Sequence, residues 1–338
     1  MAQCIKNFQI VDRIVFIDGL WGTGKSILGP VLSSFKKIEK QKVEYIFEYI
    51  SVLHGLKKIE NDAAIALMRL YADNILVNSM ISREVNFRIF DDTGFLNNPD
   101  KMKYLLRLFY RDGDAAVNRI KKEKPMLQIM THLMLRVIPL AFKSFGDNLR
   151  VVEMIRHPLY MLDHWFNYIE RCGQDPRELT IWIEHNGHSL PYFSNDWADQ
   201  FIAMNTMDKV IHSINWFTKQ INETLEQLSN HEKKQILLIP FEKFVTEPWE
   251  YIKLLESFLD TKRSTSTNKV LKKQKCPRKL LTDGLGHAHY GWKKPDKSTS
   301  ESDEYKRKML FAEKNASKES LKILESLCKD YEEKWFSF

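Results

Sequence analysis

The chain has 338 residues, of which 43% are hydrophobic, so it is long enough to bury a large core. Its formal net charge of +7 suits an anionic ligand, but the lysines are spread along the sequence instead of forming one patch, so nucleic acid is not an expected partner. The four cysteines lie far apart, and we find neither a secretory leader nor an apolar run long enough to span a bilayer. We therefore expect a cytoplasmic protein without a transmembrane segment.

The first predicted element is a buried strand over residues 14–17, which are apolar and largely β-branched. The segment that follows, 19–26, fits the pattern G-x-x-x-x-G-K-[ST] at every fixed position. Its glycines allow a tight turn whose N–H groups, together with the start of the next helix, bind an anion. The residues expected to contact a phosphate-type ligand are Trp21, Gly22, Thr23, Gly24, Lys25 and Ser26.

Strands and helices alternate along the rest of the chain. The expected strands are 43–47, 126–130, 151–155 and 236–239, with a hairpin over 180–193 that turns at Asn186-Gly187. The expected helices are 27–39, 61–82, 101–122, 159–171, 208–228, 248–259 and 304–335. This alternation predicts a single α/β domain of P-loop type over 1–338, with three layers: a mainly parallel central sheet and helices on both faces.

Polar residues follow several of the predicted strands, among them Glu48, His132 and Arg156. In parallel sheets the ligand lies beyond the carboxyl ends of the strands, so we expect these residues to face the same crevice as the glycine-rich loop. Histidine titrates near neutral pH, which makes His132 the first candidate for a general base and Glu48 the second. The planar guanidinium of Arg156 suits a phosphate. The alternatives are a structural histidine, a solvated carboxylate and a surface ion pair, respectively.

Asp91 and Asp92 are candidates for a magnesium site, because they follow a partly apolar run over 87–90. Acidic residues after a strand hold magnesium in enzymes that use nucleoside triphosphates. These two residues are therefore the candidates if the chain is a kinase.

Four segments, in this order, resemble the sulfotransferases that use 3′-phosphoadenosine 5′-phosphosulfate (PAPS), a family within the P-loop-containing superfamily. They are the loop 19–26, VVEMIRHPLYMLDHW (151–165), ILLIPFEKFVTEPWEYIKLLESFLD (236–260) and GHAHYGWKK (286–294). MTHLMLRVIP (130–139) is a looser fifth match, to the Thr-His-Leu segment that supplies the base in many members. The resemblance implies transfer of a sulfuryl group from PAPS to an acceptor hydroxyl or amine, with 3′-phosphoadenosine 5′-phosphate (PAP) as product and no metal.

The resemblance also implies roles for individual residues. The loop with Lys25 would hold the 5′-phosphosulfate, Arg156 and His164 the 3′-phosphate, and Trp292 with Lys293 would close over the nucleotide. Some carbohydrate-type members use a glutamate in the segment where Glu48 stands.

Two departures from the family pattern keep alternatives open. Gly24-Lys25-Ser26 replaces the family's usual Ser/Thr-Gly-Thr-Thr and is closer to an ATP- or GTP-binding loop, and His164 stands where the family tends to have serine. The alternatives are a P-loop kinase that uses ATP and magnesium, and a non-catalytic nucleotide-binding module. We expect residues 173–200 to form an acceptor-side insertion, 261–303 a mobile loop over the cofactor, and 304–335 a C-terminal helix. A carbohydrate or small metabolite is the favoured acceptor, and the oligomeric state does not follow from the sequence.

Overall fold

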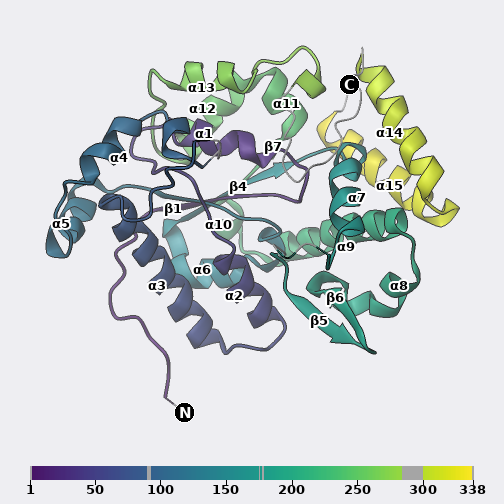
Figure 1. The fold of residues 1–338 in the computed structure, drawn as a ribbon, viewed down its shortest axis with the longest axis horizontal. Coiled ribbons are helices and arrows are strands. Elements are labelled where there is room, and N and C mark those ends of the chain that lie inside the picture. Colours follow the sequence, from purple (N-terminus) through teal and green to yellow (C-terminus); the bar gives the residue numbers. More distant parts are fainter. Residues whose placement is uncertain (1, 90–92, 175, 177–178, 284–299, 337–338) are drawn as a thin grey trace.

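The computed structural model describes residues 2–336 apart from 90–92, 175, 177–178 and 284–299. Five parallel strands form a central sheet in the order β2-β3-β1-β4-β7 (Figure 1). Their bounds are β1 Ile14–Asp18, β2 Lys42–Val43, β3 Leu127–Met130, β4 Leu149–Ile155 and β7 Ile236–Pro240. Because β1 is the middle strand, the glycine-rich loop leaves the sheet at its centre.

Alternating side chains along the strands build a core on each face of the sheet. In β1, Ile14 and Phe16 pack on one face, whereas Val15 and Ile17 pack on the other. The first face is covered mainly by α2 (Ile46–Gly55), α3 (Asn61–Met80) and α6 (Pro139–Phe145). The second is covered by α1 (Leu28–Leu32), α11 (Phe241–Thr246), α12 (Pro248–Phe258) and α13 (Thr267–Lys273). The expected three-layer α/β fold with a parallel central sheet is confirmed.

A third apolar cluster joins the hairpin to the C-terminal helices. The hairpin pairs β5 (Trp182–His185) with β6 (His188–Pro191) and turns at Asn186-Gly187, where both residues have positive φ, as predicted. The helices of this cluster are α7 (Leu162–Glu170), α8 (Ala198–Ala203), α9 (Thr206–Gln227), α14 (Glu301–Asn315) and α15 (Lys318–Trp335). The short helix α10 (Asn230–Lys233) then leads into β7.

Two predicted elements are shorter than expected. The strand predicted over 43–47 pairs with β3 at only two residues, and the chain enters α2 at Ile46. The prediction that Glu48 directly follows a strand was therefore wrong, because Glu48 lies in the first turn of a helix. The helix predicted over 27–39 is reduced to α1, after which the chain forms turns as far as Ile38.

Two predicted helices are each divided in two. The helix expected over 101–122 is split into α4 (Lys101–Arg107) and α5 (Asp114–Glu123), since Gly113 has a φ of 64°. The tail expected as one helix over 304–335 is α14 followed by α15, which begins where the Ser317 side chain caps the backbone N–H of Ser320. The loop expected over 261–303 contains α13 in its first part. Among the helices in the described part of the chain, none is both long and apolar enough to cross a membrane.

Candidate active site

Three glycines and one buried ring shape the loop after β1. Gly19, Gly22 and Gly24 have φ values of 150°, 84° and 83°, which other residues rarely adopt. A Cβ on Gly24 would lie 2.3 Å from Cε2 of Phe241, and a Cβ on Gly19 would lie 2.5 Å from the carbonyl oxygen of Met154. The loop is therefore packed directly on the sheet and α11, and its tight turn depends on the absence of side chains.

Lys25 is the cation of this loop, and only 5% of it is exposed. Its Nζ donates to the carbonyl oxygens of Gly19 (2.6 Å) and Leu20 (3.3 Å). Thr23 Oγ1 donates to the same Leu20 oxygen, and Ser26 follows half-buried at the start of the helical turn. Burial lowers the pKa of Lys25, although neighbouring carboxyl groups oppose that effect. The residues predicted to contact a phosphate thus form one continuous turn around the ammonium group of Lys25.

Two buried carboxyl groups lie beneath the loop. Asp18, the last residue of β1, accepts hydrogen bonds from Thr131 Oγ1 (3.0 Å) and from the Leu135 backbone N–H (2.7 Å). Glu153 is buried on the neighbouring strand β4, where burial and then the charge of Asp18 raise its pKa well above the usual range. Burial and the nearby Asp18 thus favour the neutral form of the Glu153 carboxyl group, an effect that Lys25 opposes.

The structure brings His132 and Glu48 together beside Lys25. The Glu48 carboxylate accepts the backbone N–H of His132, and its Oε1 lies 3.4 Å from His132 Nδ1. The ring of Tyr45 stacks on the imidazole, with centroids 5.2 Å apart and planes 9° apart. Burial, followed by the charges of Lys25 and His164, lowers the pKa of His132 well below its usual value. Burial and then Asp18 raise the pKa of Glu48. At neutral pH the imidazole is therefore uncharged and able to accept a proton.

Arg156 and His164 both reach the loop at Gly22. Arg156 Nη1 donates to the Gly22 carbonyl oxygen at 2.8 Å, while its Nε is buried and has no hydrogen-bond partner in the described part of the chain. A Cβ on Gly22 would lie 3.2 Å from His164 Cβ. The alternative was a surface ion pair between Arg156 and Glu153 or Asp163. Asp163 instead accepts from Arg307 and Lys308 of α14, and Glu153 is buried.

Trp21 lies in an aromatic cluster at the edge of the site. Its ring centroid is 4.0 Å from that of Tyr168 and 4.6 Å from that of Trp165, whose Nε1 donates to the Trp21 carbonyl oxygen at 2.7 Å. These contacts favour packing as the role of Trp21, and its contact with the bound ligand stays a prediction.

Sequence reasoning missed Arg278 as a candidate site residue. Its guanidinium lies 5.4 Å from the ring centroid of Phe241, and that of Arg156 lies 4.3 Å from the same ring. The Nε of Arg278 is also buried and has no hydrogen-bond partner in the described segments. The available signal was the basic pair Arg278-Lys279, which lies within the predicted mobile loop. Trp292, Lys293, Asp91 and Asp92 lie outside the described residues.

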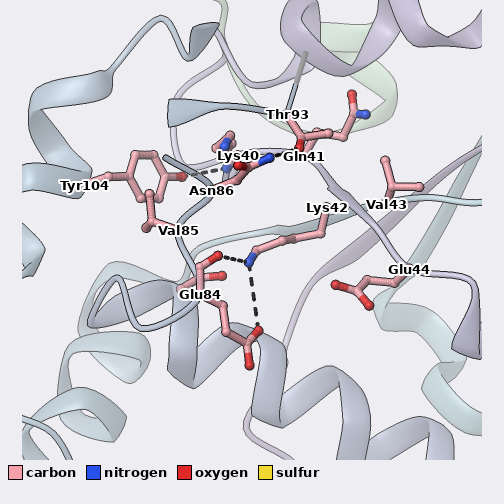
Figure 2. A pocket seen from close by; sticks show the side chains of 11 residues that line it. Lys40, Gln41, Lys42, Val43, Glu44, Glu84, Val85, Asn86, Thr93 and Tyr104 are labelled. Carbon is pink, nitrogen blue, oxygen red and sulfur yellow. Dashed lines mark hydrogen bonds and ion pairs between the residues drawn. The ribbon is translucent and has the colours of Figure 1, made fainter. Parts of the chain in front are cut away.

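A cavity of about 160 Å³ opens where β2 ends (Figure 2). Lys42 Nζ reaches across it to the backbone oxygen of Glu84 at 2.6 Å and to the Glu84 carboxylate at 3.9 Å. Glu44 also lines the cavity, and its backbone N–H donates to the Met130 oxygen at 3.4 Å, two residues before His132. The cavity therefore lies at the same edge of the sheet as the His132–Glu48 pair.

A parallel sheet, a glycine-rich loop on its central strand and a buried lysine define a P-loop α/β protein, and such a loop is typical of anion binding. The sequence matches the family model described as "Sulfotransferase domain" over residues 14–318. The chain belongs to this family, and it is a sulfotransferase.

The chain is also similar to solved sulfotransferase structures, with sequence identities of 10–12%. STF9 from Mycobacterium avium is 10% identical, with 96% of this chain and 77% of that chain covered and a TM-score of 0.44. The sulfotransferase domain of the Synechococcus PCC 7002 olefin synthase is 11% identical over 92% and 98% of the two chains, with a TM-score of 0.40. Mouse SULT7A1, solved with PAP, is 12% identical over 94% and 90%, with a TM-score of 0.38. No curated protein matches the sequence.

Proposed function

We propose that the protein transfers the sulfuryl group of PAPS to an acceptor hydroxyl in the crevice between the loop 19–26, His132 and Arg156. The observation that carries the proposal is Arg156, whose guanidinium bonds to the loop at Gly22 and keeps a buried Nε without a partner in the described residues. A buried, unpaired guanidinium N–H is costly in free energy unless an anion completes its hydrogen bonds. Such an anion next to the phosphate-binding loop fits a nucleotide with charge at both ends.

We assign the 3′-phosphate to the two arginines that lie against the Phe241 ring. Arg156 and Arg278 share this ring, and burial lowers the pKa of each guanidinium, so each gains from a dianion nearby. His164 lies against Gly22 and can donate a third hydrogen bond from its ring. Trp292 and Lys293 are kept as proposed contacts from the C-terminal segment.

The proposed base is His132, with Glu48 as a positioning residue. His132 Nδ1 is buried without a hydrogen-bond partner in the described residues, and Glu48 Oε1 lies 3.4 Å from it. If the proton of the neutral ring is on Nδ1, facing that carboxyl group, Nε2 is left to accept a proton. The acceptor oxygen forms a bond to sulfur while His132 takes its proton, and the bond from sulfur to the 5′-phosphate oxygen breaks. Lys25 and the N–H groups of the loop offset the charge on that leaving oxygen. These groups are all supplied by the chain, so we propose that transfer requires no metal.

A titration calorimetry experiment tests the nucleotide assignment. The protein is titrated with PAP and with ATP, each with magnesium and with EDTA. We expect PAP to bind in both conditions and more tightly than ATP, and Lys25→Ala to abolish PAP binding. Lys253→Ala, an exposed lysine on α12, is the matched control and should leave PAP binding unchanged. A magnesium-dependent preference for ATP would contradict the proposal and favour the kinase.

The acceptor and the compartment are proposed in general terms. A carbohydrate or small metabolite hydroxyl fits the small polar cavity at the end of β2, which is lined by Lys42, Glu44 and Glu84. All four cysteines are free, which suits a reducing compartment, and we therefore propose a cytoplasmic location. Mass spectrometry of products from a panel of hydroxyl acceptors, and fractionation of cells that express the chain, test these two points.

A further inference from the structure

Helix α4 has its polar side buried and its apolar side in solvent, which is the reverse of an ordinary surface helix. Met102 and Leu106 are four residues apart, so they share one face of the helix, and they are 57% and 55% exposed. The turn that follows adds Leu108, which is 48% exposed, and Phe109, which is 85% exposed. We call these four residues the α4 apolar face.

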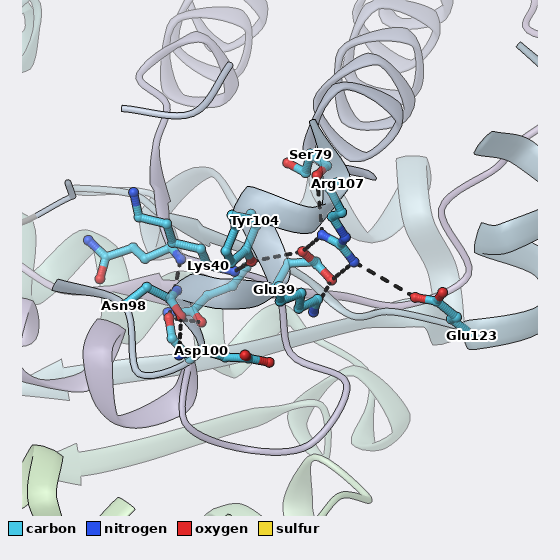
Figure 3. A network of polar contacts seen from close by, with 12 residues as sticks. Glu39, Lys40, Ser79, Asn98, Asp100, Tyr104, Arg107 and Glu123 are labelled. Carbon is cyan, nitrogen blue, oxygen red and sulfur yellow. Dashed lines mark hydrogen bonds and ion pairs between the residues drawn. The ribbon is translucent and has the colours of Figure 1, made fainter. Parts of the chain in front are cut away.

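A buried ion-pair network holds α4 in this orientation (Figure 3). Glu39 accepts two hydrogen bonds from Arg107, at 2.6 and 3.0 Å, one from Lys103 at 2.7 Å and one from the Tyr104 hydroxyl at 2.9 Å. Arg107 Nη1 also donates to the Ser79 carbonyl oxygen at 3.1 Å. Glu39 and Arg107 are almost completely buried, so the network cannot form unless α4 turns its apolar face outward. The exposure of this face is therefore built into the fold.

Basic residues outnumber acidic ones in the segment that carries the apolar face: residues 100–124 contain eight lysines and arginines against four aspartates and glutamates. Lys101 begins α4, and Arg111 follows the turn that contains Phe109; both are exposed. The next helix, α5, is attached to α4 because its Arg119 lies 4.5 Å from the ring centroid of Tyr110. Exposed lysines at positions 121, 122 and 124 lie at the end of this helix, together with the exposed Glu123. Both helices lie at the left-hand end of the molecule in Figure 1, away from the hairpin and the C-terminal helices.

We propose that the α4 apolar face, with its surrounding lysines and arginines, docks onto the surface of an anionic lipid bilayer. Apolar side chains next to basic ones insert at the boundary between headgroups and acyl chains, and binding gains from both the buried area and the attraction to anionic lipid. A second copy of the chain is a poorer occupant. In a two-fold dimer this face would meet itself and bring the same cations together. The inference does not depend on the proposed function.

Vesicle co-sedimentation of the full chain tests the proposal. We expect binding to vesicles of phosphatidylcholine mixed with phosphatidylserine, and little binding to phosphatidylcholine alone. Replacing Leu106 and Phe109 by serine should weaken binding by roughly tenfold or more, because the insertion of both side chains is lost. Lys121→Glu should weaken it by about fivefold or more, with a further loss in high salt.

Matched controls separate docking from general effects. Leu254→Ser removes an apolar side chain of similar exposure, 50%, from a different helix, α12. It should leave vesicle binding unchanged. Circular dichroism should show that the Leu106/Phe109 variant remains folded, because both side chains are exposed. Absence of binding to anionic vesicles, or binding that the Leu106/Phe109 variant retains in full, would overturn the proposal. Self-association that the same variant abolishes, without vesicle binding, would overturn it in favour of a dimer interface.

Discussion

Replacement of Arg156 by methionine provides a quantitative test of how the nucleotide is recognised. The guanidinium has five N–H donors, of which one bonds to Gly22 and one, on Nε, is buried without a partner in the described residues. If the guanidinium donates two charge-assisted hydrogen bonds to the 3′-phosphate, at about 1.5 kcal/mol or more each, the variant loses about 3 kcal/mol of PAP binding free energy. PAP affinity should then fall roughly 100-fold. Adenosine 5′-monophosphate lacks the 3′-phosphate, so its affinity should fall by no more than a few fold.

The assay is calorimetric titration of both nucleotides against wild type and variant. Arg150→Met serves as a control on the same strand, because Arg150 bonds to the Asp147 and Leu149 oxygens at the opposite end of β4. It should change neither affinity. If Arg156→Met lowers the affinity for both nucleotides equally, Arg156 stabilises the loop through Gly22 and does not bind the 3′-phosphate. That result would refute the reasoning.

Three further predictions concern stability and catalysis. Burial would raise the pKa of Glu39, but Lys103 and Arg107 lower it from 4.5 to about 2. Above pH 4.5 this pairing contributes about 3 kcal/mol to the free energy of unfolding, and the contribution is lost as the pH falls toward 2. Urea unfolding of Glu39→Gln should show that loss at neutral pH and a weaker dependence of stability on pH between 4.5 and 2. His132→Gln should lower kcat roughly 100-fold or more with little change in PAP affinity. The wild-type rate should stay constant as the pH is lowered to below 6.5, since the His132 pKa is lowered. A fall in rate whose midpoint lies above pH 6.5 would count against His132 as the base. Gly24→Ala should destabilise the fold by about 2–4 kcal/mol in urea unfolding, because its Cβ would overlap a buried ring, whereas Gly55→Ala has open space and should be nearly neutral.

The central strand and its loop could be predicted from the sequence because local signals determine both. An uninterrupted apolar run gives a strand that is buried on both faces, and the spacing of Gly19 and Gly24 matches the positive φ values that the loop adopts. The placement of His132 and Arg156 just after the carboxyl ends of two parallel strands, β3 and β4, could also be predicted, because strand ends can be read from the apolar runs.

Other features depend on tertiary contacts that no local pattern reveals. Val43 to Phe47 has strand propensity, yet Phe47 lies in helix α2, which buries it against the sheet, and Glu48 contacts His132 from the same helix. Tertiary packing overrode the intrinsic preference there. Arg278 is far from Arg156 in sequence and comes close to it only because both pack on Phe241. The orientation of α4 likewise depends on Glu39, a distant partner that reverses the expected amphipathic pattern.

A crystal structure of the complex with PAP tests the central claim most directly. The account predicts the 5′-phosphate on the N–H groups of the loop beside Lys25, and the 3′-phosphate within hydrogen-bond distance of both Arg156 and Arg278. A nucleotide whose 3′-phosphate points to solvent, or which lies outside the crevice between the loop and Arg156, would contradict it.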